Sequence, residues 1–558
     1  MNFALSSAAS ACAFAILLGP TWISPQEPPL RDPLTPAQVA AWREDLAYMA
    51  REVARRHRNL YHTVSRERFD SAVAALHRRI PQLERHQVIV ELARIAALVG
   101  DGHTNIAPTR DSAIGFRTLP VKLYFFKDGL FVRAADRQHA DLAGAKVIRI
   151  GQTTPEEAYR RARDLIGQDN EMDARFFAPF LLAMPEVLHA LRLSTDRDSA
   201  EFVIERAGRR STVRLGPQGP VSLMPPDTDV SWWPDSGWVD MRSLGKPTPL
   251  WLRRNPHDEY WLEYLPDSHL VYLQFNKVAD KVDESLEEFS RRLLALLDTA
   301  DVRWVALDVR LNRGGNGSLN RPLVLSLIKA RKLDRPGSLF VLIGRSTFSA
   351  AQFLVNELEH YTSAVFVGEP SGGKANSYGD SRKITLPHSG ITVRVSTLWW
   401  QVDERDARQW KGPDIAAELT SMDYRNNVDP ALETVLAYRP GPSVADRMAA
   451  ALDSGNVSEA LRRYRAYRAD PKYRYVETEE QLNSLGYQQL HRKRLEQAIS
   501  IFELNAAEHP RSANVWDSLA EACLLAGRRE AAIQHYRKSL QLDPRNENAR
   551  SVLAELHP

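Results

Sequence analysis

The feature that most constrains the fold is an alternation of strand-like and helix-like segments over residues 268–440. Strand-like runs such as RWVALDV (303–309), LFVLIG (339–344) and ITVRVSTLWWQV (391–402) alternate with amphipathic stretches such as LEEFSRRLLALLD (286–298). Strands that are separated by helices pair in parallel and are covered on both faces. The pattern therefore predicts an α/β core with a mostly parallel sheet, in which functional side chains gather where the strands end.

Other parts of this multidomain chain differ in the spacing of their apolar residues. Helical spacing follows Thr35-Pro36 as far as Val99, whereas hairpin signals such as Lys127-Asp128-Gly129 predict a small peptide-binding β domain of the PDZ kind, with one helix. The predicted segments are an export signal with a Pro-rich linker (1–34), an N-terminal helical domain (35–110), the PDZ-like domain (115–217), a Pro- and Trp-rich connector (218–265), the α/β core (266–440) and a helical tail (445–558).

The tail contains an internal repeat. Residues 482–510 and 516–544 align at an offset of 34 residues, so that Ala498 matches Ala532 and Pro510 matches Pro544. This period, the small residues where helices cross and the closing proline are the signature of tetratricopeptide repeats. An earlier helix pair at about 445–470 and a terminal cap helix at 546–558 extend the predicted array. Such arrays present a concave surface, and a partner protein is expected on it.

Bulk composition excludes several classes of function. The formal net charge of +3, from 73 basic and 70 acidic residues, does not indicate a nucleic-acid partner. Cys12 and Cys523 lie in separate segments and imply no disulfide framework. The apolar N-terminal stretch has the length of a signal peptide and is too short and Ser-rich for a stable membrane span. It predicts export, to the periplasm or the extracellular space; a buried or disordered N-terminus is the alternative.

Two segments of the α/β core bring a serine and a glycine loop to strand ends. The segment IGRSTFSAAQF (343–353) places Ser349 at a strand-to-helix turn, and DVRLNRGGNG (308–317) ends a buried strand in a glycine loop. N–H groups of Gly314, Gly315 and Ala350 could then stabilise an oxyanion. A lone serine is weak evidence, but a serine at such a turn beside a glycine loop indicates a nucleophile. The alternative is a buried serine that only begins a helix.

These motifs resemble those of the tail-specific, carboxyl-terminal-processing serine peptidases. TFSAAQ matches the nucleophile motif, DVRLNRGG a strand motif, VGEPSGGKANSYGD the following loop, and PDI at 413–415 the closing motif. The resemblance covers residues 268–420 closely and extends to GDGHT at 100–104 in the helical domain. It implies a crotonase-like α/β peptidase core of the tricorn-core-like branch, with Ser349 as the nucleophile and no cofactor or metal.

The resemblance leaves two candidates for the general base. Lys374 stands 25 residues after Ser349, as in the processing-protease branch, and must lose its proton to act. His103 of GDGHT corresponds to the base of the tricorn-like branch and works near neutral pH without a large pKa shift. The carboxylates nearest the position of the orienting acid in that branch are Glu404 and Asp406. The segment RRHRNLYH (55–62) is expected to be a solvated helix end.

The sequence therefore predicts a serine-type endopeptidase that acts on protein or peptide substrates. The PDZ-like domain and the repeats are expected to recruit these substrates. Two alternatives remain open: a catalytically inactive protein- or ligand-binding scaffold of the same fold, because fold does not imply chemistry, and an esterase-like hydrolase. The segment HDEY (257–260) has no second histidine at helical spacing, so no zinc site is expected.

Overall fold

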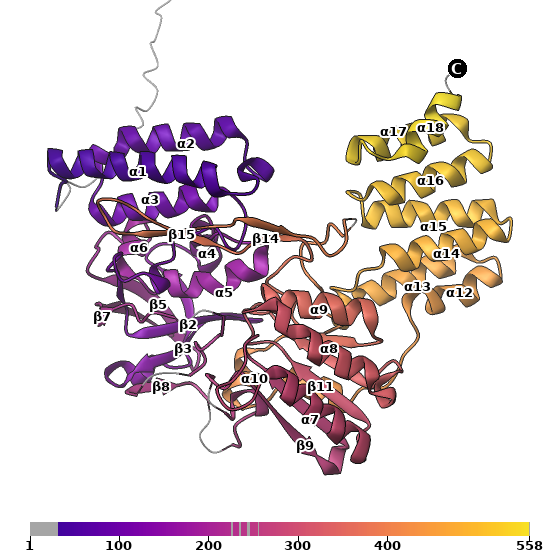
Figure 1. Cartoon of the computed structure of the whole chain (residues 1–558), viewed down its shortest axis with the longest axis horizontal. Helices are drawn as coiled ribbons and strands as arrows, with labels where there is room; N and C mark the ends of the chain where they lie inside the picture. The colour runs from indigo at the N-terminus through magenta and orange to yellow at the C-terminus, as the bar shows by residue number, and fades with distance from the viewer. Residues whose placement is uncertain are drawn as a thin grey trace, which may run out of the picture.

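The computed structural model consists of an N-terminal lobe, an α/β core and a helical arm (Figure 1). The N-terminal lobe comprises the N-terminal helices and the β domain. The predicted export signal and linker, residues 1–34, lie almost entirely outside the part of the chain that is described. No helix of the described part is long and apolar enough to cross a membrane. The structure describes residues 32–224, 227–233, 236–242, 246–254, 256–404 and 406–556.

The α/β core is built on a six-stranded sheet in the order β18-β13-β12-β11-β10-β9. All neighbouring pairs are parallel except β9 with β10, which confirms the prediction of a mostly parallel sheet. Apolar residues of α7, α8 and α9 pack on one face, and those of α11 on the other. The strands are β9 (Tyr260–Leu265), β10 (Leu270–Phe275), β11 (Trp304–Asp308), β12 (Leu339–Ile343), β13 (Val365–Gly368) and β18 (Ile415–Ala416). The helices are α7 (Leu286–Thr299), α8 (Asn320–Lys329), α9 (Ala350–Tyr361), α10 (Ser421–Arg425) and α11 (Pro430–Leu436).

Two expectations about this core were wrong. The sheet already begins at Tyr260, inside the predicted connector, because β9 forms an antiparallel hairpin with β10. The segment 391–402 does not join the sheet; its strands form two separate ribbons, β15 (Arg382–Thr385) with β16 (Thr392–Val395), and β14 (Ser377–Gly379) with β17 (Leu398–Trp400). The β15–β16 ribbon leaves the core and runs beneath the N-terminal helices (Figure 1), where Asp45 accepts hydrogen bonds from the N–H groups of His388 and Ser389.

The N-terminal helices form as the sequence predicts, and their last loop matters most for the site. Thr35 caps α1 in a reciprocal capping box with Gln38. After α3 the chain turns at Gly100, whose φ of +82° favours glycine and whose Cβ, if present, would lie 2.8 Å from Thr63. Residues 100–105 therefore leave the helices in a fixed direction, toward the core. The helices are α1 (Pro36–Arg56), α2 (Arg66–Arg79) and α3 (Arg85–Ala97).

The β domain is an antiparallel sheet in the order β2-β3-β4-β5-β6, with β8 added beside β3. It contains three α-helices rather than the one that was expected, because the segment after residue 170 forms α5 and α6. Its helices are α4 (Pro155–Arg163), α5 (Glu171–Leu181) and α6 (Pro185–Ala190). Its strands are β2 (Val121–Phe126), β3 (Gly129–Asp136), β4 (Lys146–Ile150), β5 (Ala200–Arg206), β6 (Arg209–Leu215) and β8 (Trp238–Asp240), beside a short pair of β1 (Arg117–Thr118) and β7 (Gly219–Pro220).

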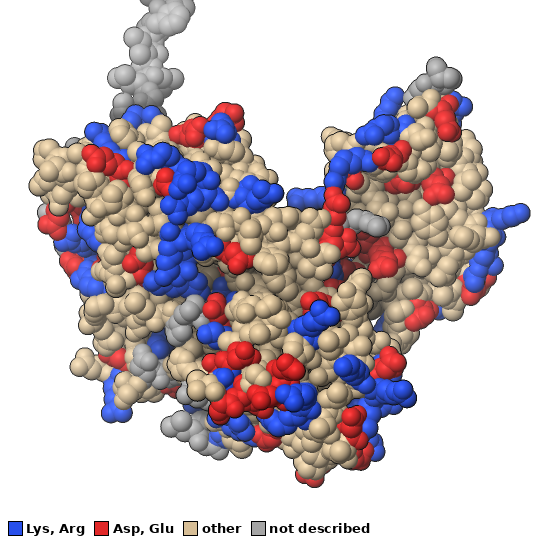
Figure 2. All heavy atoms as spheres, viewed as in Figure 1, with Lys and Arg blue, Asp and Glu red and all other residues tan. Residues whose placement is uncertain are grey.

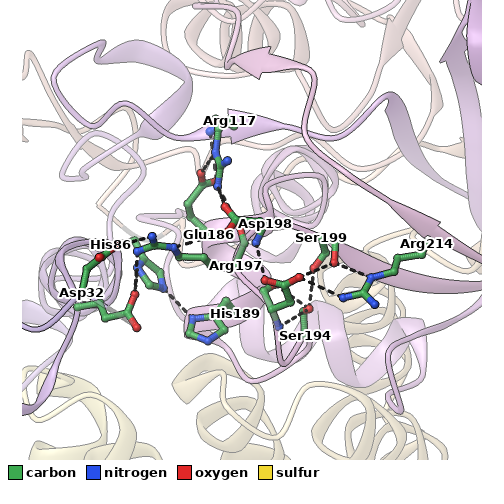
Figure 3. A network of polar contacts seen from close by, with 12 residues as sticks. Asp32, His86, Arg117, Glu186, His189, Ser194, Arg197, Asp198, Ser199 and Arg214 are labelled. Atoms are coloured by element: carbon green, nitrogen blue, oxygen red, sulfur yellow. Dashed lines mark hydrogen bonds and ion pairs between the residues drawn. The ribbon is translucent and has the colours of Figure 1, made fainter. Parts of the chain in front are cut away.

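A polar network joins the N-terminal helices to the β domain (Figure 3). Arg197 donates a hydrogen bond to Glu84 at 3.0 Å and also pairs with Asp32, which precedes α1. His86, near the start of α3, is 2.8 Å from a ring nitrogen of His189 in α6, and burial beside His189 lowers the pKa of His86 to about 3. His86 is therefore neutral over the physiological range, and the contact holds α3 on the β domain without a buried charge.

The helical arm contains three hairpins and a final helix, including the predicted earlier pair and the predicted cap. It contacts the core through Arg474, which pairs with Glu418, and through Arg545, which pairs with Glu404. Figure 1 shows the arm rising on the opposite side of the core from the N-terminal lobe. The helices are α12 (Val444–Asp453), α13 (Val457–Ala469), α14 (Glu479–His491), α15 (Leu495–Glu508), α16 (Ala513–Leu525), α17 (Arg529–Leu542) and α18 (Glu547–Leu556).

Candidate active site

Ser349 lies at the turn between β12 and α9 in a strained backbone conformation. Its φ of +55° and ψ of −125° are rare for a residue with a side chain. Strain of this kind persists only where the surrounding structure imposes it, and it is concentrated at functional sites. The side chain is half-buried, so the hydroxyl is not enclosed in the apolar core.

His103 reaches Ser349 from the other lobe. Its Nε2 atom lies 3.1 Å from the Ser349 Oγ atom, which is hydrogen-bonding distance, across 246 positions of sequence. The imidazole also stacks on Phe348, with ring centroids 4.7 Å apart and an interplanar angle of 26°. The structure thus brings together two of the residues singled out from the sequence and fixes the ring plane of the histidine.

Asp101 anchors the loop that carries His103. Its buried carboxylate accepts hydrogen bonds from the N–H groups of His103 (2.9 Å) and Thr104 (2.7 Å) and from the Ser396 hydroxyl (2.6 Å). Its second oxygen lies 2.9 Å from Nε2 of His57. Burial alone would raise the pKa of Asp101, but the hydrogen bonds from His57 and Ser396 outweigh it, and the pKa lies below its usual value. Asp101 is therefore ionised beside the imidazole of His103.

The electrostatic surroundings keep His103 neutral. Burial lowers the pKa of its imidazole; Asp101 opposes this, and the positive charges of Arg313 and Arg110 add to it. Among the described residues, no partner lies within hydrogen-bonding distance of the buried Nδ1 atom of His103. A neutral imidazole whose Nε2 atom faces a hydroxyl can accept its proton.

The glycine loop packs directly against Ser349. Gly314 has a φ of +112°, and a Cβ atom there would lie 2.8 Å from Cβ of Ser349 and 3.0 Å from the amide nitrogen of Ala350. Its own N–H donates to Asn312 Oδ1 at 2.8 Å, so the expectation that Gly314 supplies an oxyanion donor was wrong. Within the described chain, the N–H groups of Gly315 and Ala350 have no such acceptor, and Ala350 begins a helix, where N–H groups are unpaired.

Two side chains brace this loop that the sequence reading did not single out. Asn312 donates to the carbonyl of Phe275 at 3.0 Å, and its own carbonyl accepts from the N–H of Phe348. Arg313 is buried, pairs with Asp173 of α5 at 3.0 Å and lies over the Phe348 ring. Both residues fall inside the DVRLNRGG motif, so the motif marked their positions. It could not show which residues their side chains would contact.

Another missed pair, Asp169 and Asn170, connects the histidine loop to the core. Asp169 accepts a hydrogen bond from the N–H of Gly102 at 2.9 Å. The Asn170 side chain donates to the carbonyl groups of Ser371 (3.1 Å) and Gln409 (2.8 Å) in the core. Burial raises the pKa of Asp169 to about 7, while the charge of Lys374 lowers it. These residues precede α5 and carry no sequence signal beyond a polar turn.

The remaining candidates lie elsewhere. Lys374 is half-buried and makes no hydrogen bond to Ser349 within the described chain. Its positive charge instead lowers the pKa of Asp169. Asp406 pairs with Arg408 at 2.7 Å, and Glu404 pairs with Arg545 of the helical arm. Neither carboxylate contacts His103, so the expectation that one of them orients the imidazole was wrong. Each faces an arginine that is closer in the fold than the histidine loop.

No group of three metal-binding side chains occurs among the described residues. No curated protein matches this chain in sequence. A family model described as tetratricopeptide repeat matches residues 513–556, which confirms the repeat in the tail.

Solved structures with the same fold include two of the protein CPAF. A mutant of CPAF matches with a TM-score of 0.51 and 11% identity, over 72% of this chain and 99% of that chain. Mature CPAF matches with a TM-score of 0.50 and 12% identity, over 75% of this chain and 98% of that chain. The photosystem II D1 C-terminal processing protease matches with a TM-score of 0.33 and 15% identity, over 71% and 96%. At 11% and 12% identity, the likeness to CPAF concerns the fold alone. The chain therefore shares the fold of CPAF, and its C-terminal end carries a tetratricopeptide repeat.

Proposed function

We propose that this chain is a serine-type endopeptidase with Ser349 as the nucleophile and His103 as the general base. The Ser349 Oγ atom attacks the carbonyl carbon of a peptide bond while Nε2 of His103 takes its proton. The N–H groups of Gly315 and Ala350 hold the oxyanion. His103 then gives the proton to the leaving amine, and a water molecule that it deprotonates hydrolyses the acyl-enzyme.

The observation that carries this proposal is the 3.1 Å contact between Nε2 of His103 and Oγ of Ser349. Three independent features of the site agree with it. The serine backbone is strained, the imidazole is neutral, and the backbone of Gly314 packs against the serine. A serine that only caps a helix needs none of these features.

Asp101 acts in this proposal as a positioning residue. It does not reach Nδ1 of His103, but its ionised carboxylate holds the backbone of the histidine loop at two N–H groups. Its negative charge raises the pKa of His103 against the effect of burial, so it favours the imidazolium that forms during the reaction. Through His57, Asp101 is also tied to the end of α1.

Substrate recruitment is assigned to the β domain and the helical arm. A small β domain can bind an extended peptide as an added strand, and a tetratricopeptide array can bind a partner protein on its concave surface. Export to the periplasm or the extracellular space remains part of the proposal, on the N-terminal sequence alone. A binding scaffold without activity is the second candidate, because no carboxylate of the described residues contacts Nδ1 of His103.

The test is covalent labelling of the full chain with a fluorophosphonate probe, followed by digestion of an unfolded protein such as casein. We expect labelling and cleavage by the wild type, loss of both in Ser349→Ala, and loss in His103→Ala of about 10²–10⁴-fold in rate. Lys374→Ala is the matched control for the base and is expected to keep most of its activity. A wild type that is neither labelled nor active favours the scaffold, and a probe that labels without peptide cleavage favours the esterase.

A further inference from the structure

Two aromatic side chains, one exposed and one half-buried, lie beside the candidate site. Trp400, at the end of β17, is 43% exposed, which is unusual for the largest apolar side chain. Its ring lies 5.6 Å from that of Phe353, at an interplanar angle of 49°. Phe353 is half-buried in the first turn of α9, and its N–H donates to the carbonyl of Ser349 at 3.2 Å. We refer to Trp400 and Phe353 as the aromatic corner.

The aromatic corner is held in place close to the imidazole. The Trp400 indole N–H donates to Asp380 at 2.6 Å. A Cβ atom at Gly379 would lie 3.2 Å from Trp400 Cδ1 and 3.9 Å from Cε1 of His103, so this glycine is next to both the indole and the imidazole. A large ring that is oriented by a hydrogen bond, yet left exposed, is ready to bind an apolar group.

The position of the corner suits an extended polypeptide. The strands β14 and β17 lie where the N-terminal lobe, the core and the arm meet (Figure 1), and the surface is hollowed between lobe and arm (Figure 2). In the described part of the chain β17 pairs only with β14, so its outer edge is open. A substrate segment that passes Ser349 would therefore place one side chain against the corner.

We propose that Trp400 and Phe353 form a subsite for one large apolar side chain, aromatic or branched aliphatic, next to the peptide bond that is cleaved. This inference rests on the proposed peptidase function and adds its substrate class. Burying such a side chain against two rings favours it over glycine by about tenfold or more in kcat/KM. This binding free energy is gained in full only if the Trp400 ring is already oriented before the substrate binds. The hydrogen bond from the Trp400 indole to Asp380 provides that orientation.

Trp399 is the matched control for Trp400. It is the preceding residue of the same strand and is 41% exposed, but its side chain points to the opposite face, where its ring lies 4.5 Å from that of Tyr378. Replacing either tryptophan by alanine removes the same number of atoms from a similarly exposed position. A difference between the two variants therefore reflects the position of the tryptophan relative to the site, and not the loss of a tryptophan as such.

The test uses two synthetic decapeptides that differ at one central position, phenylalanine or glycine, among alanine, serine and lysine residues. Binding is measured to the full chain with Ser349→Ala, so that it does not depend on hydrolysis, and kcat/KM is measured with Ser349 present. We expect the phenylalanine peptide to be preferred about tenfold or more in both assays. The preference should be lost in Trp400→Ala and kept in Trp399→Ala and Trp400→Phe.

The outcomes separate the two proposals. If the chain cleaves the peptides but Trp400→Ala keeps the full preference, the subsite is wrong and the peptidase assignment stands. If Trp399→Ala loses as much preference as Trp400→Ala, the subsite is also wrong. If Ser349→Ala prefers phenylalanine through Trp400 while the wild type neither cleaves nor is labelled, the apolar site stands and the peptidase assignment falls. Trp400→Phe retains a ring and keeps the test decisive if Trp400→Ala fails to fold.

Discussion

Nε2 of His103 and Oγ of Ser349 are 3.1 Å apart, although one lies in the loop after α3 and the other begins α9 in the core. The site is therefore assembled from two lobes, and its integrity depends on the contacts that hold the lobes together. The β15–β16 ribbon is one such contact, because the backbone of Arg394 pairs with that of Asn105 and Ser396 binds Asp101.

The pH dependence of kcat/KM should identify the base. Burial lowers the pKa of His103 below its ordinary value of 6.5, and the base acts in its deprotonated form. We therefore expect kcat/KM to rise with pH, with a midpoint below 6.5, and to be level at neutral pH. Measurement of casein cleavage from pH 4 to pH 9 checks this. A rise whose midpoint lies well above pH 7 would instead indicate a lysine.

Replacing the anchor of the histidine loop should disable the site without touching the reacting atoms. In Asp101→Asn the amide can still accept N–H groups, but it lacks the charge that pairs with His57 and favours the His103 imidazolium. We expect kcat/KM to fall about 10²-fold, because a shift of about 1 Å in the base has effects of that size. We also expect the midpoint of the pH profile to move down, since the negative charge raises the pKa of His103.

Asp406→Asn is the control for Asp101→Asn. Asp406 was a candidate from the sequence, but it binds Arg408 and lies away from the imidazole. We expect its kcat/KM and its pH midpoint to stay within about twofold of the wild type. A large effect of Asp406→Asn together with a small effect of Asp101→Asn would contradict the positioning role of Asp101.

The sequence predicts most of the architecture because its signals are local. Periodicity of apolar residues gives the helices and strands, and the 34-residue offset gives the repeat. The motifs around Ser349, Gly314 and His103 also mark residues that the structure brings together. In each case the pattern lies within one element or one motif.

The parts that were not predicted depend on contacts between distant segments. His57 falls in a segment that reads as a solvated helix end, yet its side chain is fully buried against Asp101. The segment 391–402 has strong strand character, but nothing in it reveals that it pairs outside the main sheet. Asp406 and Glu404 are acidic residues at plausible spacing, and only the fold shows that arginines are nearer.

Gly314 should tolerate no side chain. A Cβ atom there would lie 2.8 Å from Cβ of Ser349, and the φ of +112° disfavours alanine independently of space. We expect Gly314→Ala to reduce fluorophosphonate labelling and kcat/KM by about 10²-fold, because the loop and the serine must move apart. Gly317→Ala in the same loop is the control, since a Cβ atom at Gly317 would lie no closer than 3.6 Å to any other atom, the nearest being Ala350 Cβ. Equal losses in both variants would show that the loop is merely fragile.

The buried carboxyl of Asp169 should make stability depend on pH. Its pKa is raised to about 7 in the folded chain, mainly by burial, against about 3.9 when unfolded. The folded state therefore binds more protons than the unfolded state between these values. It follows that the contribution of Asp169 to stability falls as pH rises through this range and is lowest above pH 7.

Asp169→Asn removes this titration and keeps an oxygen that can accept the N–H of Gly102. Relative to the wild type, the variant should gain stability as pH rises from 5 to 8, by at most about 3 kcal/mol, because about two pH units of this window lie below the raised pKa and each is worth 1.36 kcal/mol. Lys374 reduces the gain, since its charge stabilises the ionised form. Thermal unfolding at several pH values measures the difference, with Asp164→Asn, whose side chain is 64% exposed, as the control. Parallel stability curves for the wild type and Asp169→Asn would show that this carboxyl stays ionised in the folded chain, and that Gly102 and the histidine loop rest on a charged residue.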